Sequence, residues 1–337
     1  MSDRTTYLQS LNRALSELLQ NNDKVILFGE DIRDPYGGAF KVTKGLSAKF
    51  PNRIINTPIS EASITGLATG MALRGFKPIL EIMFGDFITL CTDQIVNHAS
   101  KFSWIYNNKV EVNLTIRTPM GGRRGYGPTH SQTLEKLFFC VPGIKIIAPS
   151  LYHDIGNILK EAVNEEELVL FIENKLDYPK RLKLSPADYD KSFTIKKSSD
   201  KFSTVFASNC NFTDPDVTII TYGGMVGIVE LAVLQMAQYG IKIDIIIPSI
   251  IKPVPFDEIL MTAKNSGRLI IAEEGTLTNG WGAELSALIA ENGFEYLKSP
   301  IKRVAALDLP IANSKSLENE ILPNEGDIKE AILEVIE

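Results

Sequence analysis

The sequence is most informative at Thr57-Pro58-Ile59-Ser60-Glu61 and in the residues that follow, Ala62-Ser63-Ile64-Thr65-Gly66-Leu67-Ala68-Thr69-Gly70. An apolar strand pattern at 53–56 runs into a proline turn, and Ser60 then occupies the position that caps a helix. Glu61 falls in the first turn of that helix, where the backbone amides stabilise a carboxylate by about 0.3–1 kcal/mol. The residues alone leave two interpretations open: an ordinary helix-start glutamate, or a functional carboxylate held at the mouth of a strand-to-helix turn.

Strands and helices alternate on both sides of this turn. Short apolar runs predict strands, and runs with helical periodicity predict helices between them. Several strands are apolar from end to end, which is typical of a parallel sheet covered by helices on both faces. The elements expected in this half are strands at 25–28, 53–56, 77–83, 110–117, 144–148 and 168–173, and helices at 6–21, 61–73, 87–106, 134–140 and 151–164.

A second, smaller α/β pattern follows a break in the periodicity. Between about 177 and 215 polar residues and prolines dominate, which predicts a linker with at most some strand content. Beyond it we expect strands at 217–222, 241–247, 268–272 and 301–306, and helices at 226–239, 256–265, 281–292 and 327–336. We therefore predict an α/β protein with two doubly wound domains, at 1–180 and 215–337, joined by a linker at 181–214.

The composition is that of an ordinary globular protein. The chain has 337 residues, 44% of them hydrophobic and 23% charged, which is enough for two buried cores. Its net charge of −6 and its lack of long basic runs argue against nucleic acid or an anionic membrane as a partner. Its three cysteines and three histidines show no metal-site spacing, and no signal peptide or long apolar stretch is recognised. A cytoplasmic protein with reduced thiols is expected.

A glycine-rich segment at 120–132, MGGRRGYGPTHSQ, is a second candidate for function. It matches neither the phosphate-binding nor the dinucleotide-binding glycine motifs, so a dinucleotide dehydrogenase is not supported. One interpretation is a surface loop that uses glycine for positive φ angles. The other is a mobile active-site loop that presents Arg123, Arg124 and His130 to an anionic ligand, because guanidinium groups bind oxygen anions in a bidentate manner.

A set of short motifs runs through the chain in a specific order. They are Gly29-Glu30-Asp31, Gly37-Gly38-Ala39-Phe40, Thr57-Pro58-Ile59-Ser60-Glu61, Glu81-Ile82-Met83-Phe84-Gly85-Asp86-Phe87, Asp93-Gln94-Ile95-Val96-Asn97, Arg117-Thr118-Pro119, His130-Ser131-Gln132, Thr221-Tyr222-Gly223 and Gly280-Trp281-Gly282-Ala283-Glu284. Together, over residues 5–337, they resemble the β subunit of the thiamine-diphosphate-dependent first component of 2-oxoacid dehydrogenase complexes. This family, of the pyruvate and branched-chain type, is part of the transketolase superfamily. The resemblance implies a pyrimidine-binding domain followed by a transketolase-type C-terminal domain.

The resemblance also implies a cofactor site for thiamine diphosphate in the first domain. It assigns to Glu61 the hydrogen bond to the ring nitrogen N1′, where a shared proton favours the imino tautomer that acts as the cofactor's own base. Phe87 matches the aromatic residue that stacks on the pyrimidine, and Met83 and Ile59 lie in the motifs that flank the same site. His130 matches an active-site histidine that orients or protonates the substrate-derived intermediate.

The superfamily's motif for the diphosphate and its metal is missing. No Gly-Asp-Gly occurs in the sequence, and Mg²⁺ needs carboxylate and phosphate oxygens as ligands. The resemblance therefore implies no metal ligand in this chain, Mg²⁺ ligands on an α subunit, and an α2β2 heterotetramer with shared sites. It implies a 2-oxoacid substrate and allows a dihydrolipoyl acyltransferase core as a further partner.

Three stretches depart from the family's pattern. Arg123, Arg124 and Tyr126 stand where the family has a neutral loop, which indicates either a substrate with an extra anionic group or a different packing of the loop. In the second domain IPSI at 247–250 lacks the family's aspartate, and Ala312-Asn313 replaces a Pro-Tyr pair. These two changes weaken the expectation of docking onto a lipoyl-dependent complex.

Two enzymatic functions and one non-enzymatic alternative follow. The first is a decarboxylating β subunit that, with an α subunit, passes an acyl group from a 2-oxoacid to a lipoyl carrier. The second is a split-chain carboligase or transketolase-type enzyme that works without a lipoyl carrier. The third is an assembly subunit without catalysis, against which the combination of Glu61, Phe87 and His130 argues.

Overall fold

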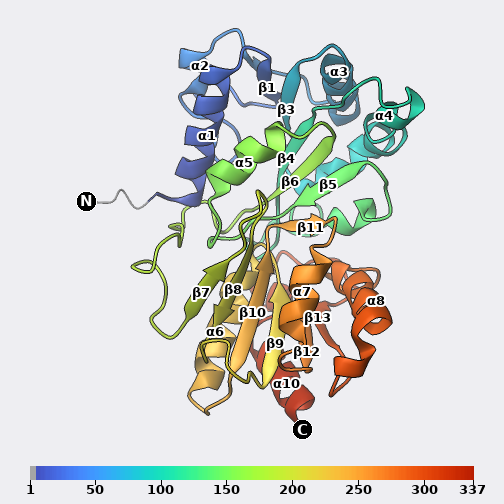
Figure 1. Ribbon diagram of the computed structural model, residues 1–337. Helices are drawn as coiled ribbons and strands as arrows, with labels where there is room; N and C mark the ends of the chain where they lie inside the picture. Colours follow the sequence, from blue (N-terminus) through green and yellow to red (C-terminus); the bar gives the residue numbers. More distant parts are fainter. Residues whose placement is uncertain (1–4) are drawn as a thin grey trace. The chain divides into compact units, whose positions relative to one another are not determined.

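The computed structural model describes residues 5–337 and divides the chain into two compact units (Figure 1). The first unit comprises the residues up to 120 together with 137–147 and 154–182. The second unit comprises 121–136, 148–153 and 183–337. The last division, after residue 182, lies close to the end of the first predicted domain at 180. The glycine-rich segment groups with the second unit.

The sheet of the first unit is parallel, as its apolar strands predict. Its strands are hydrogen-bonded in the order β5-β6-β4-β3-β1-β2, and each of these pairings is parallel. Leu27, Leu80 and Ile116 are buried within it. The strands are β1 (Val25–Gly29), β2 (Ile54–Asn56), β3 (Lys77–Glu81), β4 (Thr115–Met120), β5 (Ile144–Ile147) and β6 (Leu168–Asn174).

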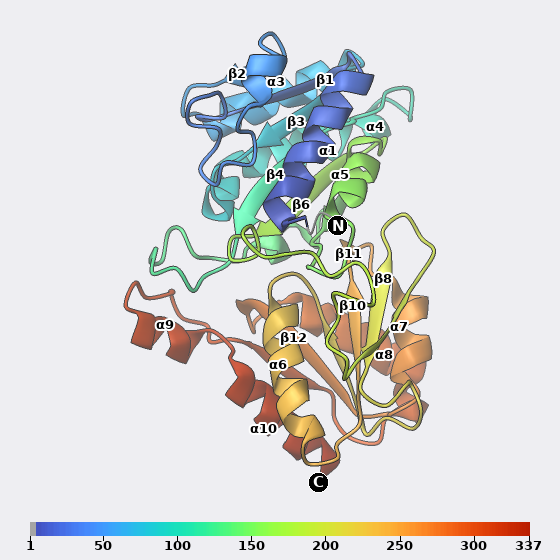
Figure 2. The ribbon, with the colours of Figure 1, turned by 90° about the vertical axis from the view of Figure 1, so that its left-hand side faces the viewer.

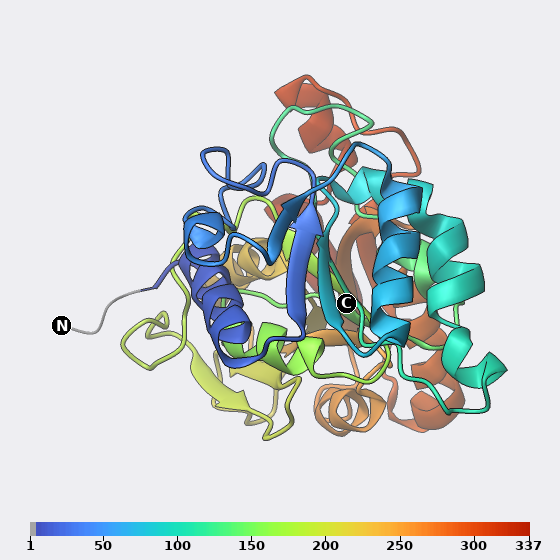
Figure 3. The ribbon, with the colours of Figure 1, turned by 90° about the horizontal axis from the view of Figure 1, so that it is seen from above.

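Helices cover both faces of this sheet. On one face α1 (Tyr7–Asn21) and α5 (Ile155–Val163) pack side by side (Figure 2). On the other face α3 (Glu61–Leu73) lies beside the 3₁₀ helix η1 (Gly85–Cys91) and the π-helix η2 (Gln94–Ala99), as the view from above shows (Figure 3). Two short helices complete the unit, α2 (Leu46–Lys49) and α4 (Phe102–Ile105). The sheet is therefore doubly wound, and its strand ends are open to hold a site.

The sheet of the second unit is mixed. Its strand order is β13-β12-β9-β10-β8-β7, and only the pairings of β8 with β10 and with β7 are antiparallel. The predicted linker at 181–214 thus supplies β7 and β8 to this sheet. The strands are β7 (Thr194–Lys197), β8 (Thr204–Ser208), β9 (Val217–Thr221), β10 (Ile243–Pro248), β12 (Leu269–Thr276) and β13 (Lys302–Ala306), and the short β11 (Ile250–Lys252) follows β10.

The helices of the second unit also lie on two faces. α6 (Met225–Ala237) and α10 (Glu325–Ile336) pack together over a core that includes Ile219, Ile245 and Ala272. α7 (Phe256–Ala263) and α8 (Trp281–Gly293) pack together over the opposite face. The short helices α9 (Lys315–Ile321) and η4 (Phe294–Tyr296) lie in the connections.

One predicted element differs in a way that shapes the site. The long helix expected at 87–106 is broken into η1, η2 and α4. Hydroxyl groups along it donate to backbone carbonyls, Thr89 to Asp86 at 2.9 Å and Ser100 to Val96 at 3.1 Å. Such bonds compete with the regular ladder of an α-helix. The helix expected at 134–140 is likewise reduced to the 3₁₀ segment η3 (Glu135–Phe138).

Candidate functional site

Glu61 is the first residue of α3 and lies just beyond the carboxyl end of β2. The turn before it is held to the neighbouring strand by a hydrogen bond of 3.0 Å from Thr57 N to Gly29 O. Ser60 occupies the N-cap position as predicted, but its hydroxyl donates to Ser63 Oγ at 2.9 Å and does not cap the helix amides. The Glu61 side chain is buried, with 6% of the residue exposed. This favours the functional interpretation, because a helix-start glutamate is normally in solvent.

A second buried carboxylate stands at the end of the adjacent strand. Glu30 follows β1, and its Oε1 has no hydrogen-bond partner among residues 5–337. Burial raises the pKa of Glu30, and the negative charges of Glu61 and Asp31 raise it further. Two neighbouring parallel strands thus lead to two acidic side chains at one edge of the sheet. The motif Gly29-Glu30-Asp31 already indicates a carboxylate at this edge, because Glu30 directly follows an apolar strand.

A hydroxyl and a thiol contact the backbone carbonyl at the start of α3. Thr65 Oγ1 donates to Glu61 O at 2.7 Å, and Cys91 Sγ lies 3.6 Å from the same oxygen. Burial raises the pKa of Cys91 to about 12; the Thr65 hydroxyl opposes this shift, and the charges of Glu61 and Glu30 add to it. The thiol is therefore neutral and serves as a packing group, a role that its position in the sequence does not reveal.

Aromatic rings extend from this point along the strand ends. Phe87 in η1 is half-buried and meets Phe84 edge to face at 5.9 Å. Phe84 in turn meets Phe40 at 5.7 Å, and Phe40 stacks on Tyr178 at 5.1 Å. Met83 is also half-buried, in the connection between β3 and η1. The predicted residues Glu61, Phe87 and Met83 thus belong to one region of the first unit.

A buried arginine fixes the strands behind these rings. Arg117 Nε and Nη2 donate to the two oxygens of Glu173 at 2.7 and 2.9 Å, and its Nη1 donates to Glu81 Oε2 at 3.0 Å. Tyr178 Oη donates to Glu173 Oε2 at 2.6 Å. Gly38, with φ of +80°, lies so close that a Cβ on it would be 2.8 Å from Glu81 Oε1. This network joins β3, β4 and β6 and gives the edge of the sheet a rigid base.

Large apolar side chains on the outer side of α3 are exposed. Ile59 is 82% exposed, Leu67 57% and Leu90 55%. A Cβ on Gly70 would meet nothing within 4 Å, while one on Gly66 would meet Gln94 Oε1 at 3.1 Å. Ile59, a predicted cofactor-binding residue, therefore points to solvent in this chain. Several large exposed apolar side chains close together in the sequence around a buried carboxylate are a feature that interfaces share.

The other predicted site residues lie in the second unit. His130 is half-buried, and its Nδ1 is 3.0 Å from Thr129 Oγ1. The Arg123 guanidinium donates to the carbonyl of Pro323, and the Arg124 guanidinium lies over the ring of Tyr126 at 5.3 Å. The Arg123 side chain thus has a packing partner within the second unit. A substrate role for Arg123, Arg124 and Tyr126 stays a prediction.

The second unit also holds a group of buried acids that the sequence did not indicate. Glu273 is 1% exposed and accepts from Gly282 N at 2.9 Å. Burial raises the pKa of Glu273 to about 7, against the opposing Gly282 hydrogen bond, and the charge of Glu135 adds to the shift. Burial also raises the pKa of Glu135, which accepts the hydroxyl of Tyr222. No single residue pattern marks this group, because Glu135 comes from η3 and Glu273 from β12, far apart in the sequence.

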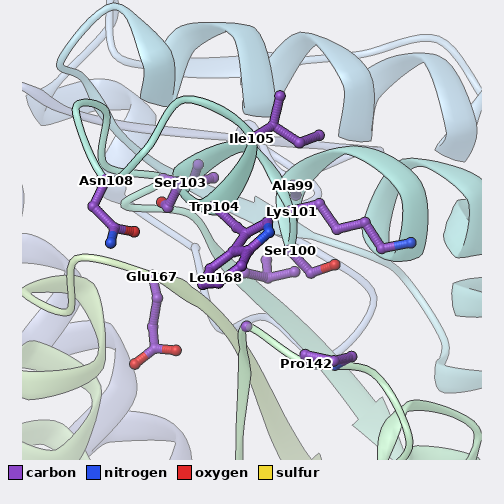
Figure 4. Close-up of a pocket in the computed structure, with 12 residues that line it drawn as sticks. Ala99, Ser100, Lys101, Ser103, Trp104, Ile105, Asn108, Pro142, Glu167 and Leu168 are labelled. Carbon is purple, nitrogen blue, oxygen red and sulfur yellow. The ribbon is translucent and has the colours of Figure 1, made fainter.

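Neither a metal site nor a membrane helix is found in the described part of the chain. Residues 5–337 hold no group of three or more acidic, histidine or cysteine side chains placed to bind a metal ion. No helix there has both the length and the apolar character to cross a bilayer. A cavity of about 550 Å³ in the first unit is lined by Trp104, Ile105 and Leu168 among others (Figure 4). It contains none of the predicted site residues.

Comparisons with known proteins agree over the length of the chain. The family described as "Transketolase, pyrimidine binding domain" matches residues 3–181, and "Transketolase, C-terminal domain" matches 210–328. The mitochondrial pyruvate dehydrogenase E1 component subunit beta-1 of Arabidopsis thaliana is 34% identical over 327 residues, covering 97% of this chain and 88% of the plant protein. The β subunit of acetoin:2,6-dichlorophenolindophenol oxidoreductase from Bacillus subtilis (strain 168) is 32% identical, covering 97% and 96%. A solved structure described as a split gene transketolase in an inactive β4 tetramer shares the fold, with a TM-score of 0.74, 20% identity and coverage of 97% of each chain.

Proposed function

The chain belongs to the family of E1 β subunits built from transketolase pyrimidine-binding and C-terminal domains, and on this premise we propose the reaction that it serves. It is the β subunit of a heteromeric thiamine-diphosphate enzyme that decarboxylates a 2-oxoacid and passes the acyl group to a lipoyl carrier. The observation that carries the proposal is the burial of Glu61 at the first turn of α3, next to Glu30.

Glu61 is proposed to hold a proton against the N1′ nitrogen of the cofactor's pyrimidine. A buried carboxylate at a helix start suits this role, because it accepts a hydrogen bond from a protonated ring nitrogen without competition from water. Thiamine diphosphate supplies, when bound, a carbon nucleophile that adds to the substrate carbonyl and accepts the electron pair released on decarboxylation. The fit rests on the donor set of the first unit, an acidic pair next to aromatic rings.

Phe87, Met83 and Ile59 are proposed as the apolar walls of the pyrimidine site. Phe87 is half-buried, so part of its ring is accessible for stacking. Ile59 is largely exposed, and we propose that it is covered by the cofactor and a second subunit together. His130 is proposed as the acid that orients or protonates the substrate, a role for which an imidazole side chain is chemically suited.

An α subunit is proposed as the partner, in an α2β2 heterotetramer with shared sites. The exposed apolar surface formed by Ile59, Leu67 and Leu90 supports this, because obligate interfaces are apolar and resemble domain cores. We propose that the Mg²⁺ ligands come from that subunit. The departures at 247–250 and at Ala312-Asn313 leave the attachment to an acyltransferase core as the least supported part of the assembly.

A second substrate deserves a direct test, because one relative of 32% identity is named for acetoin. Cleavage of acetoin and decarboxylation of a 2-oxoacid use the same cofactor chemistry, so Glu61 and Phe87 serve either reaction equally. A carboligase or transketolase-type reaction without a lipoyl carrier is a third possibility from the sequence. The substrate therefore has to be found by assay.

The first experiment tests the cofactor site. We would co-purify the chain with an α subunit encoded beside it and titrate the pair with thiamine diphosphate and Mg²⁺ in a calorimeter. The wild-type pair should bind thiamine diphosphate. The Glu61→Gln pair should still assemble, but in a turnover assay its kcat should be lower by about 10²–10⁴-fold. Glu111→Gln, at an exposed glutamate of the same unit, is the matched control. A correctly assembled wild-type pair that binds no thiamine diphosphate would contradict the proposal.

The second experiment separates the substrates. Reduction of 2,6-dichlorophenolindophenol is followed with pyruvate, branched-chain 2-oxoacids and acetoin in turn, and product formation is followed with an aldehyde acceptor. Activity with a 2-oxoacid, together with acylation of an added lipoyl domain, supports the leading proposal. Activity with acetoin alone, or with the aldehyde acceptor alone, replaces it with the corresponding alternative while leaving the role of Glu61 unchanged.

A further inference from the structure

The segment 121–132, here called the His130 loop, is closed on itself within the second unit. Gly121 N donates to Gln132 O at 3.4 Å, and His130 N donates to Gly127 O at 3.4 Å. Arg123 has φ of +68°, a left-handed conformation that a non-glycine residue rarely adopts. A backbone that alternates between right- and left-handed conformations points successive N–H groups to one side and forms an anion-binding nest.

The nest of the His130 loop is filled by a carboxylate of the chain itself. Glu318 Oε1 accepts from Arg123 N at 2.6 Å, and Glu318 Oε2 accepts from Gly125 N at 3.3 Å. Glu318 lies in the short helix α9 and is only 1% exposed. Hydrogen bonds from backbone N–H groups to an ionised carboxylate are about twice as strong as neutral ones. A buried carboxylate of this kind is expensive to leave unpaired, so the loop and α9 hold each other in place.

A second acid and a leucine complete the attachment. Glu274 Oε1 accepts from Gly122 N at 2.6 Å, one residue before the nest. A Cβ on Gly122 would lie 2.6 Å from Leu322 Cδ1 and 3.2 Å from Glu318 Oε1, so the loop backbone approaches this side closely. Three N–H groups of the loop, those of residues 122, 123 and 125, are therefore bound to carboxylates of the second unit. They are not available to a substrate phosphate or carboxylate.

The two unusual stretches of the sequence meet at this attachment. The carbonyl of Asn313 lies 3.1 Å from the position of a Cβ on Gly125, and the Asn313 Cβ lies 3.4 Å from that on Gly127. The Arg123 guanidinium donates to the carbonyl of Pro323, beyond the other end of α9. The segment 313–323 thus contacts the His130 loop on both sides of the Glu318 carboxylate.

We propose that Glu318 is a positioning residue for the reaction, which sets the place of His130 through the backbone of the His130 loop. The proposal rests on the proposed role of His130 in the enzyme. Glu318 does not touch the reacting atoms. It fixes the loop backbone at residues 123 and 125, so only a few residues separate the fixed points from His130. Misplacement of a catalytic group by about 1 Å can cost 10²-fold in rate, which is the scale of the effect that Glu318 controls.

The test compares Glu318→Gln with Glu320→Gln, an exposed glutamate of the same short helix. Glutamine keeps the shape, but its amide has one acceptor oxygen and places an NH₂ group against the second loop N–H. Amide hydrogen exchange of the assembled holoenzyme should be at least about 10-fold faster over the His130 loop in Glu318→Gln and unchanged in Glu320→Gln. Steady-state kinetics should show kcat lowered about 10–100-fold with little change in KM, and a displaced limb in the pH profile of kcat. Binding of thiamine diphosphate should be unchanged.

Gly122→Ala tests the same contact from the side of the loop. Its added methyl group meets Leu322 and the Glu318 carboxylate, and the φ angle at Gly122 imposes no backbone strain. It should reproduce the faster exchange and the loss of kcat if Glu318→Gln does not fold. Unchanged exchange in either folded variant, or faster exchange with wild-type kcat, overturns the proposal. A wild-type holoenzyme that exchanges slowly over the loop and turns over no substrate contradicts the proposed function instead, because the exchange measurement needs no substrate.

Discussion

The two units bury carboxylates in opposite ways. In the first unit Glu81 and Glu173 surround Arg117, which donates three hydrogen bonds to them. Burial by itself lowers the pKa of Arg117, but the two carboxylates raise it above its usual range, so the arginine is always charged. In the second unit Glu273 and Glu135 have no such cation, and the pKa of Glu273 rises to about 7 through burial and the charge of Glu135.

The difference affects how strongly a buried carboxylate makes the stability of its unit depend on pH. Burial raises the pKa of Glu81, but the charge of Arg117 and its hydrogen bond oppose that rise, so this network serves mainly as a structural element. A buried acid without such a cation exchanges a proton near neutral pH, so its unit changes stability with pH. In the first unit, burial and the neighbouring negative charges likewise raise the pKa of Glu30. The following substitutions break or sharpen this contrast, beginning with the largest effect.

Removal of the central cation should have the largest effect. Arg117→Met leaves Glu81 and Glu173 buried without a cation and should lower the free energy of unfolding by about 3–5 kcal/mol at pH 7. The loss should shrink in acid, where the two carboxylates become protonated. Urea denaturation at pH 7 and pH 5 measures both. Arg53→Met, which removes an ion pair to the exposed Asp23 and a hydrogen bond to the Asn22 carbonyl, is the control and should cost about 1–2 kcal/mol. Equal losses of unfolding free energy in the two arginine variants would contradict the special role of the buried Arg117.

Neutralising Glu273 should stabilise the protein above pH 7. In the folded wild type this carboxyl binds a proton at a higher pH than in the unfolded chain, so stability falls as the pH rises from about 4.5 to about 7. Each unit of the shift corresponds to about 1.4 kcal/mol. Glu273→Gln keeps an acceptor for Gly282 N and removes this slope. Unfolding free energies at pH 5 and pH 8 should differ less in the variant than in wild type or in Glu284→Gln, an exposed glutamate of α8. A slope that survives the substitution refutes the assignment.

Two buried tyrosines allow a finer test of the first network. Tyr178→Phe removes the hydroxyl that donates to Glu173 and should cost about 1.5–3 kcal/mol, the value of a hydrogen bond to a charged group. Tyr7→Phe is the matched control, because the Tyr7 hydroxyl is buried and has no partner among residues 5–337. It should be neutral or slightly stabilising. Thermal or urea unfolding compares the two, and a larger cost at Tyr7 would show that the network extends further than these bonds indicate.

The smallest effect is expected at Glu30. The pKa of this acid is raised in the folded protein, so its charge costs stability once the pH exceeds the ordinary value for a glutamate. Glu30→Gln should raise the unfolding free energy at pH 8 slightly, because the amide carries no charge to be buried. At pH 4 it should change nothing. Melting temperatures at the two pH values, with Glu111→Gln as reference, measure the difference; an equal gain at both would point to a cause other than charge.

Local patterns predicted the fold well where periodicity is strong. The alternating strands and helices and the position of Glu61 at a helix start follow from runs of apolar residues and from the turn at Pro58. They failed where tertiary contacts decide. The helix expected at 87–106 is divided into three short helices, and β7 and β8 are recognisable as strands only through the pairing of β8 with β10 and of β7 with β8.

The candidate site was predictable to the same degree. Glu61, Met83 and Phe87 were identified because motifs carried them, and they lie in one region of the first unit. Glu318 was not identified, because α9 is short and exposes Leu317, so nothing in its pattern marks a buried acid. The contact made by the Arg123 side chain could not be predicted from the sequence either, because its partner, the Pro323 carbonyl, is 200 positions away.

The attachment of the His130 loop has a consequence for recombination between related genes. Its donors at residues 122 and 123 are separated from their acceptors at residues 274 and 318 by 152 and 195 positions. A single crossover between these segments joins the loop of one parent to the acids of another. Chimaeras that exchange residues 121–323 as one block inherit a matched set, whereas those with a breakpoint near 182, where the structural units divide, do not. The boundary between the two structural units near residue 182 is therefore an unsuitable breakpoint for chimaeras.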